Sequence, residues 1–538
     1  MTDKLFAYHV DLKRAMWRPE YFATMAKRLR PWGYNAFVIE IEDKFRYRNH
    51  PAIVHPDAPS HADWRAIAKA CRAEGIEIVP LMQSLGHVEF IVGKPEYARL
   101  REAPDIEKQF DPTSKEALAL LYELYDEVIE VLRPKEFFHV GGDETWQLGQ
   151  SAKCRPLVEK IGVGGLYLQF MLPLFEHVHA RGLRPMVWAD IFLSHPEIIP
   201  RAPKHTVMVD WEYGITEERP RQFRIWGGSR EKGTLNKVYT WDEYRKADRP
   251  EFRAGFEKYV VDDRTRRDGT FVGFYCTDAL LGSGFDVVTA PANRCAGDMA
   301  GTPRSTMHWP NCFYFARKGM ARGIGTLVTS WTVRHNHPDL CLAGTFAASQ
   351  GVRMADAFDA EALGRAFTKE MYGVEFPRFT AAVLRASDSF SLGQAGHLVN
   401  ARAALAAGKD PLAAYLEGVD KVPGGRKDAL AEKRRTATGY AEAGRALAAM
   451  KHRAKRNAHQ FDFWLEGIAF NLLCTDCVIA ALDGSLKKKA SSLRRRLRYR
   501  RDITRALFAE TYPPRSVEEE IALRYGFWDE VLKRNEKK

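Results

Sequence analysis

The chain has 538 residues, which is enough for two or three domains or for one large barrel with an appendage. With 45% hydrophobic and 28% charged residues, its composition is that of an ordinary soluble globular protein. No apolar run reaches the roughly 18 residues of a membrane span, so we expect no membrane partner.

Short β-prone runs alternate with amphipathic helical stretches over residues 1–345, a pattern typical of βα units and a parallel sheet. The helices expected between the strands include residues 19–29, 61–73, 114–132 and 166–180. Eight strands fit either a (β/α)8 barrel or a doubly wound sheet, which this pattern alone does not separate. The expected strands are residues 5–11, 36–41, 76–82, 136–141, 185–191, 206–211, 271–277 and 326–331.

The interval from residue 212 to 270 is longer than a crossover needs and is rich in Arg, Lys, Asp and Gly. We expect a long loop over the mouth of the barrel. Its aromatic residues Trp226, Trp241 and Tyr244 either face a substrate or anchor the loop onto the barrel.

Residues 346–538 form a second region, in which β-prone runs disappear and helix-spaced apolar residues continue to the end. A homodimer through this helical region is possible. Much of the net charge of +12 lies here, in Lys487 to Lys489 and in R-R-R-L-R-Y-R-R at 494–501. Such a run can bind nucleic acid or another polyanion, but we favour a solvated helix face answered by acids such as Glu518 to Glu520.

Eight cysteines are few for this length, and most stand inside apolar patterns, which indicates reduced, buried thiols rather than disulfides. Cys474 and Cys477 form a C-x-x-C without a second ligand pair, and His335 and His337 lack a zinc-like spacing, so we predict no metal and no cofactor. The N-terminus does not read as a signal peptide, and we therefore expect a cytoplasmic protein.

The most informative segment of the sequence is F-F-H-V-G-G-D-E-T-W at 137–146. Successive side chains on a strand point to opposite faces, so Asp143 and Glu144 can serve one substrate only if the chain bends. Gly141 and Gly142 permit such a bend. Paired carboxylates at a strand end suit cleavage of a glycosidic bond, although the same two acids also suit the start of a helix.

His139 to Glu144, H-x-G-G-D-E, resembles the signature of the family-20 glycoside hydrolases, the β-N-acetylhexosaminidases. Three further motifs resemble the hexosaminidase D branch in the same order: D-L-K at 11–13, I-E-I-E-D at 39–43 and P-L-M-Q-S-L-G-H-V-E-F at 80–90. The resemblance covers about the first two-fifths of the chain. It implies a (β/α)8 barrel and an exo-acting, retaining enzyme that removes terminal β-linked GlcNAc or GalNAc from a glycan.

The resemblance also implies substrate-assisted catalysis, in which the 2-acetamido oxygen attacks C1 and forms an oxazolinium intermediate. Glu144 would then be the acid and base, and Asp143 would orient the acetamido group. The tyrosine that donates to the acetamido oxygen is expected at Tyr213, with Tyr275 on the seventh predicted strand as runner-up. Since a general acid must keep its proton, we expect a raised pKa for Glu144 beside an ionised Asp143.

Other expected contacts to the sugar stand at strand ends. A tryptophan box around the acetamido methyl group is implied at Trp188, Trp211 and Trp331. Carboxylates that can hold sugar hydroxyls are Glu42, Asp43, Asp190 and Asp11, and His87 and His139 can orient the site carboxylates, although His139 fits a structural role better.

Two departures from the family pattern stand out. The chain enters its first strand without the small domain that many members carry before the barrel. The arginine that commonly binds sugar hydroxyls from that strand is not visible in Tyr8 to Asp11, so a preference between GlcNAc and GalNAc does not follow. Two alternatives remain open: a conventional retaining glycosidase with Asp143 as nucleophile, and a non-catalytic barrel that binds carbohydrate or polyanions.

Overall fold

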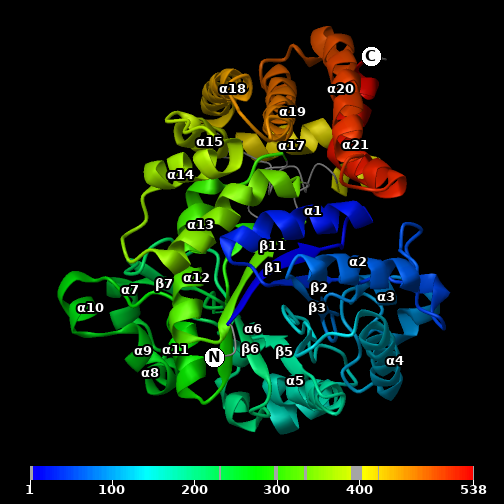
Figure 1. The fold of residues 1–538 in the computed structure, drawn as a ribbon, viewed down its shortest axis with the longest axis vertical. Coiled ribbons are helices and arrows are strands. Elements are labelled where there is room, and N and C mark those ends of the chain that lie inside the picture. Colours follow the sequence, from blue (N-terminus) through cyan, green and yellow to red (C-terminus); the bar gives the residue numbers. More distant parts are fainter. Residues whose placement is uncertain are drawn as a thin grey trace.

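The computed structural model describes residues 4–229, 232–295, 298, 301–332, 336–388, 403–421 and 423–536. Eight of its strands pair in parallel, each with the next in the sequence, and the first also pairs with the last, so the sheet closes into a barrel (Figure 1). The predicted (β/α)8 barrel is therefore confirmed. Its strands are β1 (Leu5–Asp11), β2 (Ala36–Glu40), β3 (Glu77–Leu81), β4 (Phe137–His139), β5 (Arg184–Trp188), β6 (Val207–Trp211), β9 (Asp286–Ala290) and β11 (Gly325–Ser330).

The barrel interior is a packed core of mostly small and β-branched side chains rather than a pore, as expected of strands that are covered on both faces. Helices cover the outside, and their apolar faces join the larger core. The interior residues include Ala7, Ala36, Val38, Val79, Leu81, Met186, Val207, Val209, Val288 and Leu327.

Local sequence signals place the first helices well. Helix α1 (Pro19–Leu29) begins with proline at its first turn, and α2 (His61–Ala73) has a reciprocal capping box between Ser60 and Asp63. Both helices have the predicted bounds. Further helices of the barrel part are α3 (Glu89–Val92), α4 (Lys115–Leu132), α5 (Arg155–His179), α6 (Asp190–Ser194), α12 (Ser305–Arg322) and α13 (Leu342–Arg353). Its 3-10 helices include η1 (Arg30–Trp32), η2 (Pro51–Ile53), η3 (Pro95–Leu100), η4 (Pro196–Arg201) and η5 (Pro338–Cys341).

The predicted strand at 271–277 is wrong. Residues 271–274 are not in regular structure, and helix α11 (Tyr275–Gly282) follows them, while the seventh barrel strand is β9. A short continuous apolar run reads the same as a buried strand or a buried helix, which explains the error. A short strand, β10 (Ala292–Arg294), extends the edge of β11.

The interval after β6 is a folded insertion instead of a simple loop. It contains an antiparallel pair, β7 (Gln222–Arg224) and β8 (Val238–Thr240), and the helices α7 (Trp241–Lys246), α8 (Pro250–Gly255), α9 (Glu257–Val260) and α10 (Asp263–Asp268). Phe223 packs against Tyr244, Phe252, Phe271 and Tyr275 at centroid distances of 4.4–5.8 Å. Tyr244 therefore anchors the insertion.

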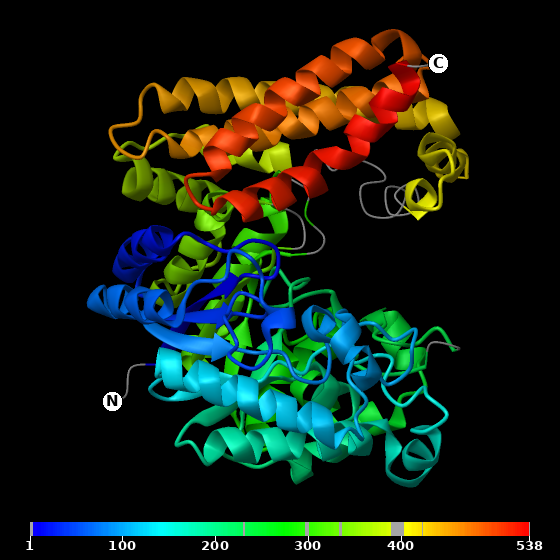
Figure 2. The ribbon, with the colours of Figure 1, turned by 90° about the vertical axis from the view of Figure 1, so that its right-hand side faces the viewer.

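The C-terminal region is helical, as predicted, and its last helices form a layer on one side of the barrel (Figure 2). The predicted boundary at residue 345 falls inside α13, which packs on α12. The described helices beyond it are α14 (Ala360–Tyr372), α15 (Phe379–Asp388), α17 (Pro411–Asp420), α18 (Gly425–Lys451), α19 (Gln460–Leu482), α20 (Leu486–Phe508) and α21 (Pro514–Glu536).

Among the described residues, two helices, α5 and α19, are long and apolar enough to cross a membrane by length and composition alone. In α19, 72% of the most apolar stretch is buried inside the folded chain, where it packs between α18 and α20. The core of a helical layer accounts for that composition.

The basic run of α20 is answered by acids on neighbouring helices. Arg494 contacts Asp529 at 2.9 Å, Arg496 contacts Asp476 at 2.7 Å, and Arg505 contacts Glu518. These pairs favour the interpretation of α20 as a charged helix face within the layer.

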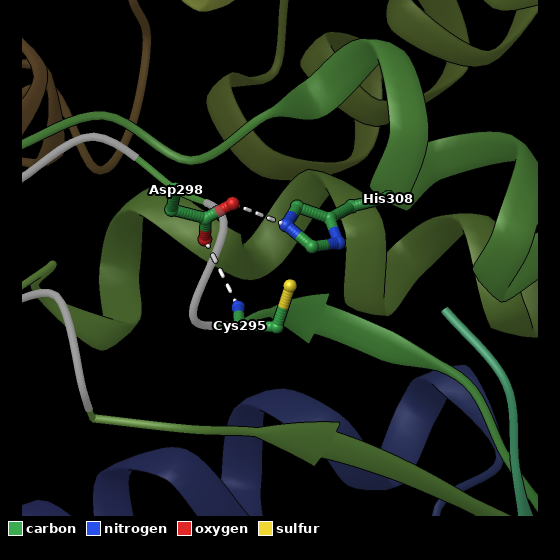
Figure 3. Close-up of side chains that lie close together, drawn as sticks. All are labelled: Cys295, Asp298 and His308. Atoms are coloured by element: carbon green, nitrogen blue, oxygen red, sulfur yellow. Dashed lines mark hydrogen bonds and ion pairs between the residues drawn. The ribbon is translucent and has the colours of Figure 1, made fainter. Parts of the chain in front are cut away.

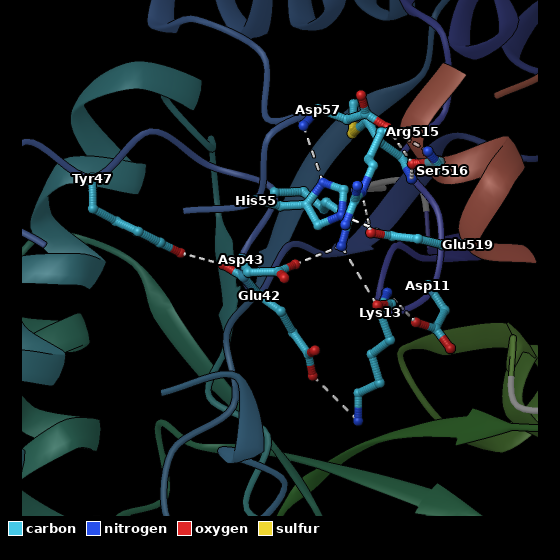
Figure 4. Close-up of polar contacts among 12 residues, drawn as sticks. Asp11, Lys13, Glu42, Asp43, Tyr47, His55, Asp57, Arg515, Ser516 and Glu519 are labelled. Atoms are coloured by element: carbon cyan, nitrogen blue, oxygen red, sulfur yellow. Dashed lines mark hydrogen bonds and ion pairs between the residues drawn. The ribbon is translucent and has the colours of Figure 1, made fainter. Parts of the chain in front are cut away.

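The first turn of α21 holds the loops that follow β1 and β2 (Figure 4). The Ser516 hydroxyl donates to Asp57 at 2.7 Å and accepts from the Met16 backbone at 3.1 Å. His55 Nε2 lies 2.9 Å from Glu519 Oε2. The helical layer thereby fixes two loops that carry charged residues into the mouth of the barrel.

Candidate active site

The chain bends sharply after β4, where the sequence predicted it. Gly141 and Gly142 have φ angles of +65° and +87°, and a Cβ on Gly141 would lie 2.0 Å from Gln83 Oε1. Beyond the bend, His87 Nε2 lies 3.5 Å from Asp143 Oδ2 and 3.4 Å from Glu144 Oε2. The two acids therefore converge on one side chain. The alternative of a helix start is wrong, because the next helix, α5, begins only at Arg155.

Three residues at this end of the barrel have strained backbone conformations. Glu42, His87 and Glu144 have φ angles of +46°, +54° and +51°. Such left-handed conformations are costly for residues with a Cβ, and they are found where the surrounding structure enforces them, often at functional sites. Glu144 is held by its backbone N–H, which donates to Asp190 Oδ2 at 2.9 Å.

The pKa shifts of Asp143 and Glu144 are the reverse of the predicted ones. Burial raises the pKa of Asp143, whereas the ion pair with His87 lowers the pKa of Glu144, whose side chain is 44% exposed. Burial disfavours the charged imidazole of His87, but Asp143 and Glu144 outweigh it and raise its pKa to about 9. At neutral pH the shared proton therefore lies on His87, and Glu144 is ionised.

The three tryptophans predicted for the box belong to one cluster of rings. The ring of Trp331 lies 5.7 Å from that of Trp188, and its indole N–H donates to the Tyr213 hydroxyl at 2.8 Å. Tyr213 lies over Trp211 at 5.1 Å, and Trp211 contacts Trp226 of the insertion at 4.8 Å. These rings form one continuous cluster, which we call the tryptophan wall.

Tyr213, and not Tyr275, is the tyrosine of this wall. Burial raises the pKa of the Tyr213 hydroxyl, which accepts a hydrogen bond from the Trp331 indole at 2.8 Å. Tyr275 begins α11 instead of lying on a barrel strand, and its hydroxyl donates to the backbone oxygen of Arg224 at 2.8 Å.

Three other predicted residues have supporting positions. The Asp11 carboxylate accepts from the Lys13 backbone and from both the backbone and the hydroxyl of Thr332, so it ties the ends of β1 and β11 together. Asp190 is 1% exposed and lies behind Glu144. His139 is fully buried against Trp188, and burial lowers its pKa to about 3, which suits a neutral structural histidine.

A buried charge network beneath the pair was missed. Lys13 Nζ lies 3.3 Å from both Glu40 Oε1 and Glu42 Oε1. Glu40 also contacts His9 Nε2 at 3.1 Å and accepts from Gln83 Nε2 at 2.9 Å. The signal was in the sequence: a glutamate between two isoleucines in a buried strand requires partners, because a buried unpaired charge is very costly.

A cavity of about 840 Å³ is bordered by Glu144. We call it the lateral cavity. Its wall includes none of the three tryptophans of the box. It is lined by Gly86, His87, Lys108, Gln109, Glu144, Thr145, Trp146, Gln147, Leu148, Gln150, Val163, Ile191, Ser194, His195, Gly227, Gly228 and Leu235.

Cys295, Asp298 and His308 form a compact group of metal-ligand types at the end of β10 (Figure 3). His308 Nε2 lies 2.6 Å from Asp298 Oδ1, and its Nδ1 lies 2.7 Å from the Ala292 backbone oxygen. Both ring nitrogens face oxygen acceptors, so both carry protons and neither offers a lone pair to a metal. Asp298 accordingly raises the pKa of His308 to about 10 despite its burial. The group is a buried ion pair that joins Asp298 to α12.

A closed (β/α)8 barrel with two adjacent acids at the carboxyl ends of its strands is an arrangement that many enzymes share, glycoside hydrolases among them. Residues 42–223 match the glycosyl hydrolase family 20 catalytic domain, and this segment includes Asp143 and Glu144. This segment of the chain, about a third of its length, is therefore similar to that catalytic domain.

Curated relatives agree with the predicted branch. Hexosaminidase D of Bos taurus is 31% identical over 214 residues, and hexosaminidase D of Homo sapiens is 30% identical over 213 residues. Each match covers 38% of this chain, and the chain spans 62% of the bovine relative and 44% of the human one. Among solved structures, β-N-acetylhexosaminidase from Bacteroides fragilis NCTC 9343 is similar at 15% identity and a TM-score of 0.46, over 69% of this chain and 70% of that chain.

Proposed function

We propose that the protein is an exo-acting, retaining β-N-acetylhexosaminidase that removes terminal β-linked GlcNAc or GalNAc by substrate-assisted catalysis. This proposal rests on the different surroundings of the two adjacent acids. Asp143 is 7% exposed, and its Oδ1 has no hydrogen-bond partner among the described residues, whereas Glu144 borders the lateral cavity.

The division of labour follows from these positions. An acetamido N–H on the side of the tryptophan wall can donate to the free oxygen of Asp143, and the hydroxyl of Tyr213 can donate to the acetamido oxygen. That oxygen attacks C1 while Glu144 protonates the departing oxygen, which gives an oxazolinium ion and a free alcohol. Glu144 then removes a proton from water, water attacks C1, and the acetamide is restored with retained configuration.

Glu144 must be protonated for the first step, although it is ionised beside His87 at neutral pH. The proton is available on His87 Nε2, 3.4 Å from Glu144 Oε2. Its transfer to Glu144 leaves a neutral histidine and a protonated acid. Hydrogen bonds of this kind often shorten when the substrate binds.

The test is an assay on aryl β-N-acetylglucosaminide and β-N-acetylgalactosaminide, with a thiazoline mimic of the cyclised sugar as competitor. Hydrolysis of either glycoside with strong thiazoline inhibition supports the proposal. A covalent adduct on Asp143 from a 2-fluoro sugar would indicate the conventional mechanism instead. Failure to hydrolyse either glycoside would favour a non-catalytic, carbohydrate-binding barrel.

We also propose a reducing location such as the cytoplasm. All eight cysteines are free and buried, as expected where thiols stay reduced. Detection of the native protein in cell fractions is the corresponding test.

A further inference from the structure

The lateral cavity has a one-sided charge. Glu144 is the only carboxylate among its described lining residues, whereas Lys108, His87 and His195 are basic. Lys108 is exposed, and no acid among the described residues pairs with its ammonium group. His87 contacts the two site carboxylates, and His195 Nδ1 lies 3.4 Å from Glu197 Oε1, so Lys108 is the basic lining residue that remains available to an occupant.

Lys108 is held in place by its backbone. Its carbonyl accepts from the Val88 N–H at 3.1 Å, and Phe110 donates to the Leu85 carbonyl at 3.0 Å. These bonds join the segment that carries Lys108 to the loop that carries His87. The backbone of Lys108 is therefore fixed beside the loop that carries His87, and the charge of its ammonium group contributes to the lowered pKa of Glu144.

The remaining wall suits a sugar. Trp146 is half-buried and offers a ring, and sugars bind aromatic faces through their apolar C–H surfaces. Thr145 is 3% exposed, and its hydroxyl has no hydrogen-bond partner among the described residues. A volume of about 840 Å³ exceeds what one departing oxygen atom needs and falls in the usual range for small-molecule sites.

We infer that the lateral cavity is the subsite for the departing part of the substrate and selects an acidic sugar, a uronic acid in its simplest form, with Lys108 as the counter-ion. The inference rests on the proposed function, because it takes Glu144 as the acid that protonates the departing oxygen. It adds a substrate class: N-acetylhexosamine linked to an anionic sugar.

Because of the charges around Glu144, an acidic leaving group also affects the protonation of Glu144. The groups that act on Glu144 are His87, Lys108 and Lys13 on the positive side and Asp143 and Asp190 on the negative side. A carboxylate bound to Lys108 offsets positive charge that keeps Glu144 ionised. An acidic leaving group therefore favours the protonated form of the acid that must release it.

The experiment compares two disaccharides that differ only in charge: N-acetylhexosamine β-linked to glucuronic acid, and the methyl ester of the same compound. We expect a KM about fivefold lower for the acid than for the ester, the upper range for a partly exposed ion pair, and a smaller difference at high salt. Lys108→Gln should abolish the difference, and Lys108→Arg should keep it.

Lys27→Gln is the matched control. This substitution removes the same charge, but Lys27 lies in the last turn of α1, outside the lateral cavity. Equal KM values for acid and ester in the native protein would overturn the inference, as would a preference that survives Lys108→Gln. Hydrolysis of an uncharged aryl N-acetylhexosaminide in the same series separates the two proposals: its absence contradicts the proposed function, whereas its presence without a charge preference contradicts only the acidic subsite.

Discussion

The two ends of the barrel both carry a cavity and a group of charges, but only one of them has the features of an active site. At the base, a cavity of about 520 Å³ lies among Lys4, Arg30, Arg72, Lys135 and Arg184. At the mouth, the lateral cavity adjoins Asp143 and Glu144. Volume and charge are therefore insufficient to identify the site.

The difference lies in how the charges are satisfied. At the base, Glu77 contacts Arg72 at 2.7 Å and Lys135 at 3.0 Å, and Arg184 contacts Asp286 at 2.7 Å, all near solvent. At the mouth, by contrast, Asp143 and Asp190 are buried and each has one oxygen without a hydrogen-bond partner among the described residues. Buried acceptors without donors are costly, and a ligand that donates to them recovers that cost.

Glu144→Gln should have the largest effect. Loss of a general acid typically costs about 10²–10⁴ in rate, and the loss should be greatest for a sugar leaving group, which needs the proton more than an activated phenol does. The measurement is kcat/KM on both substrate types. Glu136→Gln, at the base cavity, is the matched control and should leave both values unchanged. Equal losses on sugar and aryl leaving groups would argue against an acid role for Glu144.

Gly142→Ala should destabilise the fold more than the same change near the base. A Cβ on Gly142 would lie 2.8 Å from the Tyr167 hydroxyl and 2.9 Å from Met171 Cε, at a φ of +87°. Strain and overpacking together predict a loss of about 2–4 kcal/mol in the free energy of unfolding. Gly182 has a φ of +76° with nothing within 4 Å, so Gly182→Ala should cost only about 1–2 kcal/mol. Denaturant midpoints of the two variants give the comparison, and equal midpoints would contradict it.

Local patterns in the sequence predicted the alternation of strands and helices and the position of the acid pair, whereas the closed barrel was implied by the family resemblance. Helices α1 and α2 have clear start signals, and Gly141 and Gly142 mark the bend. The seventh strand was misplaced because F-V-G-F-Y-C-T has no period that separates strand from helix. That error also put Tyr275 at the site, although its hydroxyl is bound within the insertion.

The directions of the pKa shifts of Asp143 and Glu144 could not be predicted from adjacent residues. They depend on His87, which comes from another strand end, and on the unequal exposure of Asp143 and Glu144. The network of Lys13, Glu40 and His9 likewise joins β1 to β2 across the closed sheet. Long-range contacts of this kind become visible only when the barrel is assembled.

His87→Gln should move the pH dependence of activity. In the native protein the proton that Glu144 uses lies on His87, whose pKa is about 9, so the alkaline limb follows that group. Without the imidazole Glu144 must hold the proton alone, so we expect the alkaline limb of the kcat/KM profile on an aryl substrate to shift to lower pH. His452→Gln, in the exposed segment after α18, should leave the limb in place. An unmoved limb in His87→Gln would show that His87 does not control Glu144.

The same variant has a stability signature whose sign follows from the raised pKa of His87. A group with a folded pKa of about 9 and an unfolded pKa of about 6.5 contributes its full stabilisation below pH 6.5. The contribution is lost as the pH rises through 9. The difference in free energy of unfolding between native protein and variant should therefore shrink across this window, and a constant difference would contradict the ion pair.

Arg184→Gln at the base should have the smallest effect. Arg184 begins β5 and pairs with Asp286, which begins β9, and the two side chains are 28% and 47% exposed. Solvent and salt screen such a pair, so its loss should lower the free energy of unfolding by less than about 1 kcal/mol and leave kcat/KM unchanged. Denaturant unfolding at low and high salt, with steady-state kinetics on the same samples, measures both quantities. A marked loss of activity would mean that charge at the base reaches the carboxylates through the packed interior, and the two ends of the barrel would then be electrostatically coupled.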